Sequence, residues 1–535
     1  MTDVTQHRGV VTARRGMAAS SQPLATAAGL QALQQGGSAA DAALAISAVL
    51  CVTEPHASHL GGDAFILAYD HSTNQTTAYN GSGVCPEAIT PELFSTGIPV
   101  RGPAAASVPG LVDAWFALHK EHGRLPVSEL LKPAIYYASE GYPLSYRTAR
   151  VLAGSSPLRS EFPNTFHTLS GGKEPIPGQL IRQPDLALSL SLIADNGSDI
   201  FYDGRLAENI AEYCKKNGGY ISRKDLAAHA TQVTEPIKIT YRGYNVYGQP
   251  PVSQGHILLQ ELNLLEGFSL TEMGHNSSDT IHLMVEAKKL AFADRAAYLG
   301  DPKFVDVPIS TLLSKEYAKQ RRTEISLKSS IQRPSPGEMT HDTTYFCTAD
   351  SEGNVISFIQ SVFWVYGSAA IVDGTGILLN NRMSGFSLNP ASPNYIQPGK
   401  KPAHTLNAWL ITTTEANAEK AAFAGGTPGA DIQVQTNLQI ISNLIDYGMN
   451  PQQAIEAPRW QHGPSTGGGN EEEALELEDR IDESVIKILA EKGHLVRSIG
   501  PWAHGSACQV IAVCPVTGSY FGGSDPRCDG HAAGF

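Results

Sequence analysis

Cysteine is scarce in this chain of 535 residues. Seven cysteines occur, and no two of them are spaced C-x-x-C; they stand at positions 51, 85, 214, 347, 508, 514 and 528. An odd number at irregular spacing argues against a disulfide framework and against a structural zinc site. We therefore expect reduced thiols that pack as small apolar side chains.

Long apolar runs and excess positive charge are also lacking. The most apolar run, Ala42–Val52, is shorter than the ~20 residues that a bilayer-spanning helix needs, and residues 1–8 contain no apolar signal core. The chain has 39 basic and 52 acidic residues, a net charge of −13, and no basic cluster flanked by aromatic residues. The expectation is a cytoplasmic protein with neither nucleic acid nor a membrane as its partner.

Hydrophobic residues make up 42% of the chain, enough for a large buried core. Residues 20–55 read as two helices rich in small residues. Ser20 or Ser21 is expected to cap the first helix ahead of Pro23, and Ser38 with Asp41 resembles a capping box that opens the second. Small side chains allow close packing, so this pair is expected in a helical layer against a sheet.

The middle of the chain is predicted to be mostly helical from Pro126 to Thr323, with an amphipathic helix over Ser278–Ala297. Residues 324–342 are polar and contain two prolines and a glycine, as in an exposed or mobile segment. Strand-like sequence follows directly.

Residues 343–349 and 355–361 predict a β-hairpin around the turn 350–354. If the pairing is symmetric about Glu352, Thr343 lies opposite Ser361, and directly opposed side chains share one face of a sheet. Further strands at Ala421–Ala424 and Cys508–Val513, with a helix over Ile432–Tyr447, predict alternating layers of sheet and helix.

A threonine at the start of a strand, after a polar segment, suggests a chemical use. Cleavage of the Asp342–Thr343 bond would free an α-amine on the residue that carries the hydroxyl. Such an amine has a pKa of about 7.7–8.0 and can act as general base toward its own Oγ. The alternative is that Thr343 is there only because β-branched residues favour strands.

Separated motifs resolve this choice through a resemblance to the γ-glutamyltranspeptidase family, whose members are self-processing N-terminal-nucleophile (Ntn) hydrolases. The chain resembles the family over nearly its whole length, in motifs that occur in family order: 16–20 (GMAAS), 36–43 (GGSAADAA), 60–62 (LGG), 108–110 (VPG), 343–346 (TTYF), 350–355 (DSEGNV), 378–381 (LLNN), 425–429 (GGTPG), 446–448 (DYG) and 524–527 (SDPR).

The resemblance implies an α/β fold, a four-layer αββα sandwich, without cofactor or metal. It implies a large subunit of residues 1–342 and a small one of 343–535, intertwined as one globular domain. Thr343 would be the nucleophile, and Thr344 and Ser361 would hold it through their hydroxyls. Backbone N–H groups of Gly429 and Ala430 would form the oxyanion hole, although Ala430 replaces a glycine of the family.

The family's substrate-binding residues are only partly matched. The acid that binds a glutamyl ammonium is replaced by Gly385, and Arg382 stands where the family has an amide. The arginine of the family's large subunit falls on Ser82. His404 and Thr405 replace paired serines. Asn381 and His59 complete the substrate-binding candidates.

These departures predict a small anionic amide substrate with its carboxylate close to the scissile carbonyl, bound by the planar fork of Arg382. Within the family the chain looks most similar to oxamate amidohydrolases of purine degradation, which implies hydrolysis of oxamate to oxalate and ammonia. Three alternatives stay open: a γ-glutamyltransferase or glutathione hydrolase, a β-lactam acylase, and a binding protein that is never cleaved.

Glu54, His56, His59 and Asp63 form the most metal-like cluster, but their spacing matches no standard zinc motif, so no metal is predicted. The expected partners are the substrate and the two subunits of one precursor. The sequence leaves open whether processed units pair as a homodimer.

Overall fold

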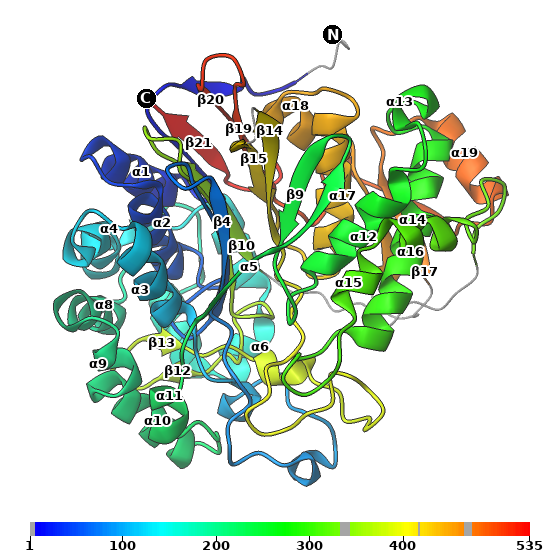
Figure 1. Cartoon of the computed structure of the whole chain (residues 1–535). Helices are drawn as coiled ribbons and strands as arrows, with labels where there is room; N and C mark the ends of the chain where they lie inside the picture. The colour runs from blue at the N-terminus through cyan, green and yellow to red at the C-terminus, as the bar shows by residue number, and fades with distance from the viewer. Residues whose placement is uncertain (1–5, 332–342, 416–417, 465–472) are drawn as a thin grey trace.

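Two antiparallel seven-stranded sheets lie face to face at the centre of the protein, in a computed structural model that describes residues 6–331, 343–415, 418–464 and 473–535 (Figure 1). The β10 sheet has the order β21 (His531–Gly534), β2 (Met17–Ser20), β10 (Thr344–Ala349), β11 (Val355–Ser361), β3 (Asp63–Asp70), β4 (Gln75–Asn80), β7 (Gln232–Thr234). The β15 sheet has the order β1 (Val11–Ala13), β20 (Tyr520–Ser524), β19 (Gln509–Val513), β15 (Ala418–Gly426), β14 (Ala408–Glu415), β9 (Tyr244–Gly248), β8 (Ile237–Tyr241).

Helices cover the outer face of each sheet, on the left and right of Figure 1. One layer packs on the β10 sheet: α1 (Pro23–Gln34), α2 (Ala39–Thr53), α3 (Leu111–His122), α4 (Val127–Glu140), α8 (Pro184–Asn196). The other packs on the β15 sheet: α12 (Gly255–Leu265), α14 (Ser278–Tyr298), α17 (Ile432–Ile445), α18 (Pro451–Glu456). The predicted four-layer αββα sandwich is therefore confirmed.

Strand residues alternate between two cores. Tyr345 and Ile359 of the β10 sheet pack between the sheets, whereas Phe346 and Phe358 pack against the helices. The Tyr345 hydroxyl lies 2.7 Å from Ser357 Oγ, which donates to the carbonyl of Trp409 in the opposite sheet at 2.9 Å. A polar bond thus joins the two sheets within an apolar layer.

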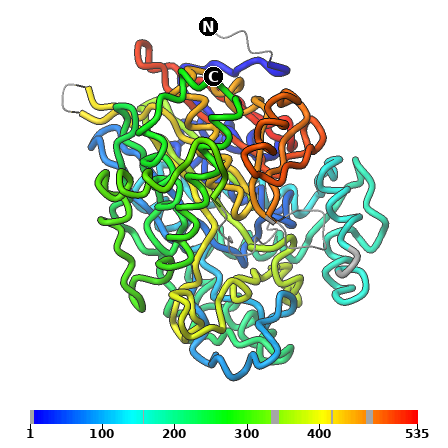
Figure 2. The backbone as a smooth tube through the Cα atoms, turned by 90° about the vertical axis from the view of Figure 1, so that its right-hand side faces the viewer, coloured from blue at the N-terminus to red at the C-terminus, as the bar shows by residue number. Residues whose placement is uncertain are grey.

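Smaller elements surround the sandwich. Figure 2 shows α5 to α7, in cyan, as a lobe at one side of the body. The remaining helices are α5 (Tyr146–Gly154), α6 (Ser156–Ser160), α7 (Pro163–Ser170), α9 (Asp199–Tyr202), α10 (Arg205–Lys216), α11 (Arg223–Ala227), α13 (Leu270–Met273), α15 (Ile309–Leu312), α16 (Lys315–Arg322), α19 (Glu483–Glu491) and the 3₁₀ segments η1 (Pro91–Phe94), η2 (Pro103–Ala105), η3 (Arg382–Gly385). The small sheets are β16 (Trp460–Pro464) with β17 (Glu473–Glu478) and β18 (Val496–Ile499), β12 (Ile371–Val372) with β13 (Ile377–Leu378), and β5 (Tyr142–Pro143) with β6 (Leu180–Ile181). Among the described helices, none combines the length and apolarity needed to cross a bilayer.

The predicted hairpin is confirmed in its register. Thr344 pairs with Gln360 and Ala349 with Val355, which is the symmetric pairing about Glu352. The turn is fixed by Asp350, whose Oδ1 accepts the N–H groups of residues 352 and 354.

The capping box of Ser38 and Asp41 is also confirmed, whereas the predicted cap of the first helix is wrong. Gln22 caps α1, because its Oε1 accepts the N–H groups of residues 24 and 25. The two candidate serines are engaged elsewhere: Ser20 is the last residue of β2, and Ser21 donates to Glu54.

The prediction of a mostly helical stretch from Pro126 to Thr323 is wrong for residues 232–248. This part forms β7, β8 and β9, and the β8–β9 hairpin is the edge of the β15 sheet. Only alternate residues of β8 are buried, a period-two pattern too short to stand out between long helices. The helix predicted over Ser278–Ala297 is confirmed as α14, but it is buried along most of its length.

Replacement of Asp41 by alanine should destabilise the fold. Asp41 is fully buried, and its carboxylate accepts the N–H groups of Ser38, Arg124 and Leu125, which joins the start of α2 to the α3–α4 connection. Asp41→Ala leaves these donors unpaired, so urea unfolding should show a loss of about 2–4 kcal/mol. Asp41→Asn, which keeps one acceptor oxygen, should lose less; equal losses would contradict this account.

Candidate active site

Thr343 and Ser361 lie side by side at the end of the β10–β11 pair. The Thr343 hydroxyl donates to Ser361 Oγ at 3.2 Å, and Ser361 Oγ also accepts the N–H of Phe363 at 2.8 Å. Both threonine and serine are almost completely buried. The predicted juxtaposition of the two hydroxyls is therefore present; Asp342, on the other side of the predicted cleavage site, lies outside the described residues.

The Thr344 hydroxyl, predicted to hold Thr343, is bonded on the helical side of the sheet. Its hydroxyl donates to Glu54 Oε2 at 2.9 Å and lies 2.7 Å from Ser21 Oγ. Neighbouring residues of a strand point to opposite faces, so Thr344 faces α2 while Thr343 faces the space between the sheets. These bonds anchor the start of β10 to the helical layer.

A row of side chains continues from Thr343 across the β10 sheet. Ser361 pairs with Asp63 of β3, so the two side chains share the inter-sheet face with Thr343. Arg382, from η3, donates from Nε to Asp63 Oδ2 at 2.9 Å, and its guanidinium lies 4.2 Å from the ring centre of Phe363. Arg382 is thus joined, through Asp63, to the row that contains Ser361 and Thr343.

Arg382 is fully buried, and neither of its terminal nitrogens, Nη1 and Nη2, has a hydrogen-bond partner. Burial raises the pKa of Asp63 and lowers that of Arg382, and the ion pair between them opposes both shifts. A buried charged group with unmade hydrogen bonds is costly in free energy. The two Nη groups are therefore available to donate to a further hydrogen-bond acceptor.

Lys401 adds a second cation to this region. Its Nζ donates to the Ser82 carbonyl at 2.6 Å, and burial lowers its pKa to about 8 against the opposing effect of Asp301 and Asp63. The Ser82 hydroxyl, a predicted substrate contact, is buried without a partner.

His404 lies at the side of this group, edge-on to Phe65 at 4.9 Å between ring centres. Burial, together with the charges of Arg382 and Lys401, holds its pKa well below the ordinary value, so the imidazole is neutral. Neither of its ring nitrogens has a partner, and the same is true of the Thr405 hydroxyl.

A cleft of about 290 Å³ opens next to His404 and Thr405. Its walls come from the residues just before α12 and α17, from the end of α14, from the segment after β11, and from η3 with the loop that follows it: Gln254, Arg295, Ala296, Leu299, Phe363, Gly385, Ser392, Pro393, Asn394, Ala403, His404, Thr405 and Asp431. Gly385 in this wall supplies no carboxylate for an ammonium group, and the carboxylate that the wall does contain, Asp431, is paired with Arg295.

Two other candidates make hydrogen bonds within the protein, although His59 Nε2 is buried without a partner. Asn381 accepts the N–H of Trp364 and donates to the carbonyl of Val100, bonds that count against a direct contact with substrate. His59 accepts the N–H of Leu378 through Nδ1, and burial lowers its pKa to about 3. Both therefore brace the loops on which Arg382 is carried.

Two residues of the turn after β15 have a positive φ. Gly429 and Ala430 have φ values of +122° and +50°. A side chain on Gly429 would lie 2.5 Å from Ile432 Cγ1, so glycine is required there. Asp431, in a bidentate ion pair with Arg295, and Gln254, which donates to the Ala430 carbonyl, hold the turn from the helical side.

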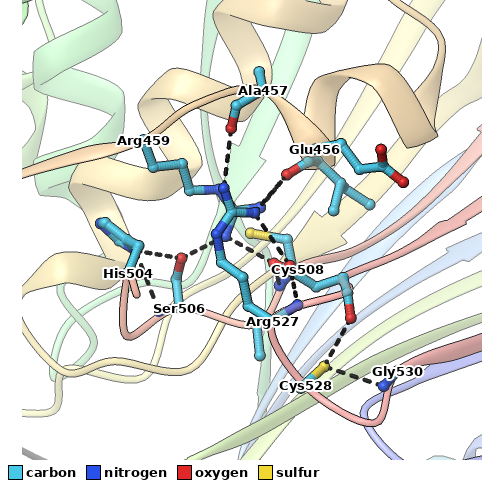
Figure 3. A network of polar contacts seen from close by, with 12 residues as sticks. Glu456, Ala457, Arg459, His504, Ser506, Cys508, Arg527, Cys528 and Gly530 are labelled. Carbon is cyan, nitrogen blue, oxygen red and sulfur yellow. Dashed lines mark hydrogen bonds and ion pairs between the residues drawn. The ribbon is translucent and has the colours of Figure 1, made fainter. Parts of the chain in front are cut away.

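A buried ion network supports the same turn from the other side (Figure 3). Arg459 donates to Ser506 and pairs with Asp525 at 2.7 Å, and the N–H of Cys508 donates to Asp525. Burial favours a neutral Asp525, yet Arg459 and Arg527 together hold its pKa below the ordinary value. The loop that contains Ser506 and Cys508 is held by these bonds. It contacts the turn, because the N–H of Ala507 donates to Thr427 Oγ1 at 3.0 Å.

The cluster of Glu54, His56, His59 and Asp63 is divided between separate roles. Glu54 holds Thr344, and Asp63 holds Arg382. Within the described residues, the group whose atoms approach closely enough for a metal ion lies elsewhere, at His282, Glu286 and His494.

Several contributors escaped the sequence analysis. No sequence motif marks Lys401, Phe363 or the Asp431–Arg295 pair as part of the site. The sequence indicates Asp63 only as a potential metal ligand. Its partner Arg382 is 319 residues away in the chain, so no local pattern relates them.

Comparison with known proteins agrees with this architecture. A family model described as Gamma-glutamyltranspeptidase matches residues 25–535. The glutathione hydrolase-like YwrD proenzyme of Bacillus subtilis is 40% identical over 528 residues, covering 98% of this chain and 99% of that protein. The oxamate amidohydrolase proenzyme of Klebsiella pneumoniae is 33% identical over 529 residues, covering 97% and 98%.

Among solved structures, the cephalosporin acylase of Bacillus halodurans is similar with a TM-score of 0.91 and 36% identity, covering 100% of this chain and 98% of that one. The resemblance inferred from the motifs is thereby confirmed. The chain belongs to the γ-glutamyltranspeptidase family and is an Ntn hydrolase that acts on amide C–N bonds.

Proposed function

We propose that this chain is a precursor that cleaves its own Asp342–Thr343 bond and then hydrolyses a small carboxylate-bearing amide, with oxamate as the specific candidate. The observation that carries the proposal is the buried row of Thr343, Ser361, Asp63 and Arg382, in which a threonine hydroxyl meets a serine hydroxyl and an arginine offers unpaired nitrogens.

In the proposed reaction the freed α-amine of Thr343 takes the proton from its own Oγ, and the oxygen attacks the amide carbon of the substrate. The N–H groups of Gly429 and Ala430 stabilise the oxygen that becomes negative. Ammonia leaves with the proton, and water then releases the acyl group as a carboxylate. Ser361, through its bond to the hydroxyl, orients the nucleophile.

The architecture is compatible with such a cleavage. The β10 sheet takes β2, β3, β4 and β7 from before Thr343, and β10, β11 and β21 from after it. A cut before Thr343 would separate two chains that share this sheet and its core, so backbone hydrogen bonds and buried apolar surface would keep them together. A large subunit of residues 1–342 and a small one of 343–535 would stay one globular unit.

The substrate assignment rests on charge and geometry. A carboxylate has two oxygens in one plane, which suits the paired donors of a guanidinium. The two unpaired nitrogens of Arg382 are buried beside the nucleophile, and Lys401 makes the region more positive. A substrate with adjacent carboxylate and amide, such as oxamate, satisfies both requirements.

A β-lactam acylase is the second candidate. The cleft of about 290 Å³ beside Phe363 and His404 has room for a larger acyl group, and the cephalosporin acylase has the same fold at 36% identity. Arg382 would then bind a more distant carboxylate. Glutathione is a weaker candidate, because Gly385 supplies no carboxylate for its ammonium group.

The first test is the cleavage itself. Purified protein should give two bands of about 36 and 21 kDa on a denaturing gel, in proportion to the two lengths of a 57.0 kDa chain, and the smaller should begin Thr343-Thr344-Tyr345. Thr343→Ala removes the nucleophile and should stay a single inactive chain, whereas Thr343→Ser keeps a hydroxyl and should still be cut. One full-length band from active wild-type protein would reject self-processing and with it the mechanism.

Ser361→Ala should slow turnover without abolishing it. The variant loses the oxygen that accepts from Thr343 but leaves the nucleophile and its amine in place, so kcat should fall about tenfold. The matched control is Ser357→Ala, which removes a hydroxyl from the same strand four residues before Ser361. A Ser361→Ala enzyme with unchanged kcat per cleaved molecule would show that this bond has no part in the reaction.

Substrate choice is tested by ammonia release from oxamate, compared with hydrolysis of glutathione, a γ-glutamyl anilide and a glutaryl amide. Arg382→Gln should raise KM for the anionic substrate by about two to four powers of ten. Because this change strands Asp63, the double variant Asp63→Asn with Arg382→Gln serves as its control and should show the same rise. An unchanged KM in both variants would reject the carboxylate-binding role of Arg382. No turnover of oxamate by the wild type would reject oxamate as the substrate.

A further inference from the structure

A polar cluster in the outer helical layer holds the part of the chain that leads toward Thr343. Three of its residues come from α14 and two from the turn between α19 and β18; together they are called the tail clamp: His282, Glu286, Lys289, Lys492 and His494. Four of them contact residues 326–331, and His494 contacts His282. Residues 326–331 follow α16 and are the last described residues before Thr343.

The first contacts are with the backbone of this segment. His282 Nε2 lies 2.7 Å from the Ser326 carbonyl, and Lys492 Nζ donates to the Leu327 carbonyl at 2.7 Å. The Ser330 N–H donates in turn to the Lys492 carbonyl at 2.8 Å. Residues 326–330 have no helix or strand of their own, so these bonds supply what regular structure would otherwise provide.

Glu286 and Lys289 complete the contact at Ile331. The Ile331 N–H donates to Glu286 Oε2 at 2.7 Å, and Lys289 Nζ donates to the Ile331 carbonyl at 3.0 Å, to Ser330 Oγ at 2.6 Å and to Glu286 Oε1 at 2.9 Å. The side chains of Glu286 and Lys289 are 0% and 5% exposed.

An ammonium group has three donors, and two of the three acceptors of Lys289 belong to the segment. A buried ion pair is stable only when its remaining donors and acceptors are bonded. The hydrogen bonds of Glu286 and Lys289 are therefore complete only when residues 326–331 are in place. This requirement selects one position for the segment.

The two histidines complete the arrangement without a charge. His494 Nε2 lies 2.7 Å from His282 Nδ1, and burial lowers the pKa of both imidazoles, to about 3 for His494. His282, His494 and Glu286 also bring three potential metal-ligand atoms within 4.8 Å of one another. The ammonium of Lys289 already neutralises Glu286 and would repel a metal ion, which favours the segment over a metal as the occupant.

We propose that the tail clamp is a positioning site for self-cleavage: it fixes the chain at Ile331 and so accelerates cleavage before Thr343. The inference rests on the proposed function. Eleven residues, 332–342, connect this fixed point to the scissile bond. Fixing the far end of a short connection reduces the conformations available to the chain and raises the fraction that presents the bond to Thr343.

The test uses the full-length precursor, made in a short pulse of cell-free translation and followed by gel electrophoresis. Glu286→Gln with Lys289→Met removes both buried charges at once and should slow the first-order cleavage about fivefold or more, while turnover per cleaved molecule stays unchanged. Lys492→Met, a milder change at the rim of the cluster, should slow cleavage about twofold and decides the matter if the double variant does not fold.

Thr280→Ala is the matched control, since Thr280 lies on the same helix and bonds the Gly274 carbonyl outside the clamp. It should cleave at the wild-type rate. Clamp variants that cleave as fast as wild type, or a control that slows equally, would overturn the inference. Slowing of wild-type cleavage by EDTA that Zn²⁺ restores would assign the histidines to a metal and also overturn it. A wild-type precursor that is never cut before Thr343 would instead reject the proposed function itself.

Discussion

The antiparallel pairing of β10 with β11 is the constraint on which the site depends. Once the register is set by the turn at Asp350, the face of every residue in the two strands follows. Thr343 and Ser361 must share the inter-sheet face, and Thr344 must point to the helical layer. A slip of one residue would exchange these faces and bring Thr344 into the space between the sheets. The placement of Thr343 beside Ser361 is therefore a property of the ladder rather than of a flexible loop.

Buried charge organises the surroundings of that pair. Asp525 with Arg459, and Asp431 with Arg295, are ion pairs in which the terminal nitrogens of each arginine are bonded, and both support the turn that contains Gly429 and Ala430. Arg382 differs from them, because its Nε is paired with Asp63 while its terminal nitrogens are not bonded. An incompletely satisfied buried charge is unfavourable in the free protein, and this is the physical basis for assigning a ligand to it.

The sheet that carries the nucleophile is also shared by the two parts of the chain on either side of residue 343. Strand β10 pairs with β2 on one side and with β11 on the other, and β11 pairs with β3. Stability of the sandwich and placement of the hydroxyls are thus provided by the same hydrogen bonds. The tail clamp lies in the opposite helical layer, on α14, whose C-terminal part also provides Arg295 to the turn.

The hairpin, its register and the layered fold could be predicted from sequence, because turn residues and alternating apolar residues are local signals. The motifs that identify the family are local too. Sequence could also point to Arg382 and His404, since each stands at a marked departure from a family motif. It failed at Gln22, whose capping role depends on Ser21 being engaged by Glu54.

Only the tertiary structure decided which distant residues meet. Asp63 and Arg382 are 319 positions apart, Glu54 and Thr344 are 290 apart, and Glu286 meets Ile331 across 45. Such pairs form because two sheets and two helical layers pack at fixed spacings, and the energy of a buried charge depends on every group around it. The sequence determined the β10–β11 hairpin, the faces of its residues and the family; the packing of the layers determined the partner of each charge and the atoms that are left without one.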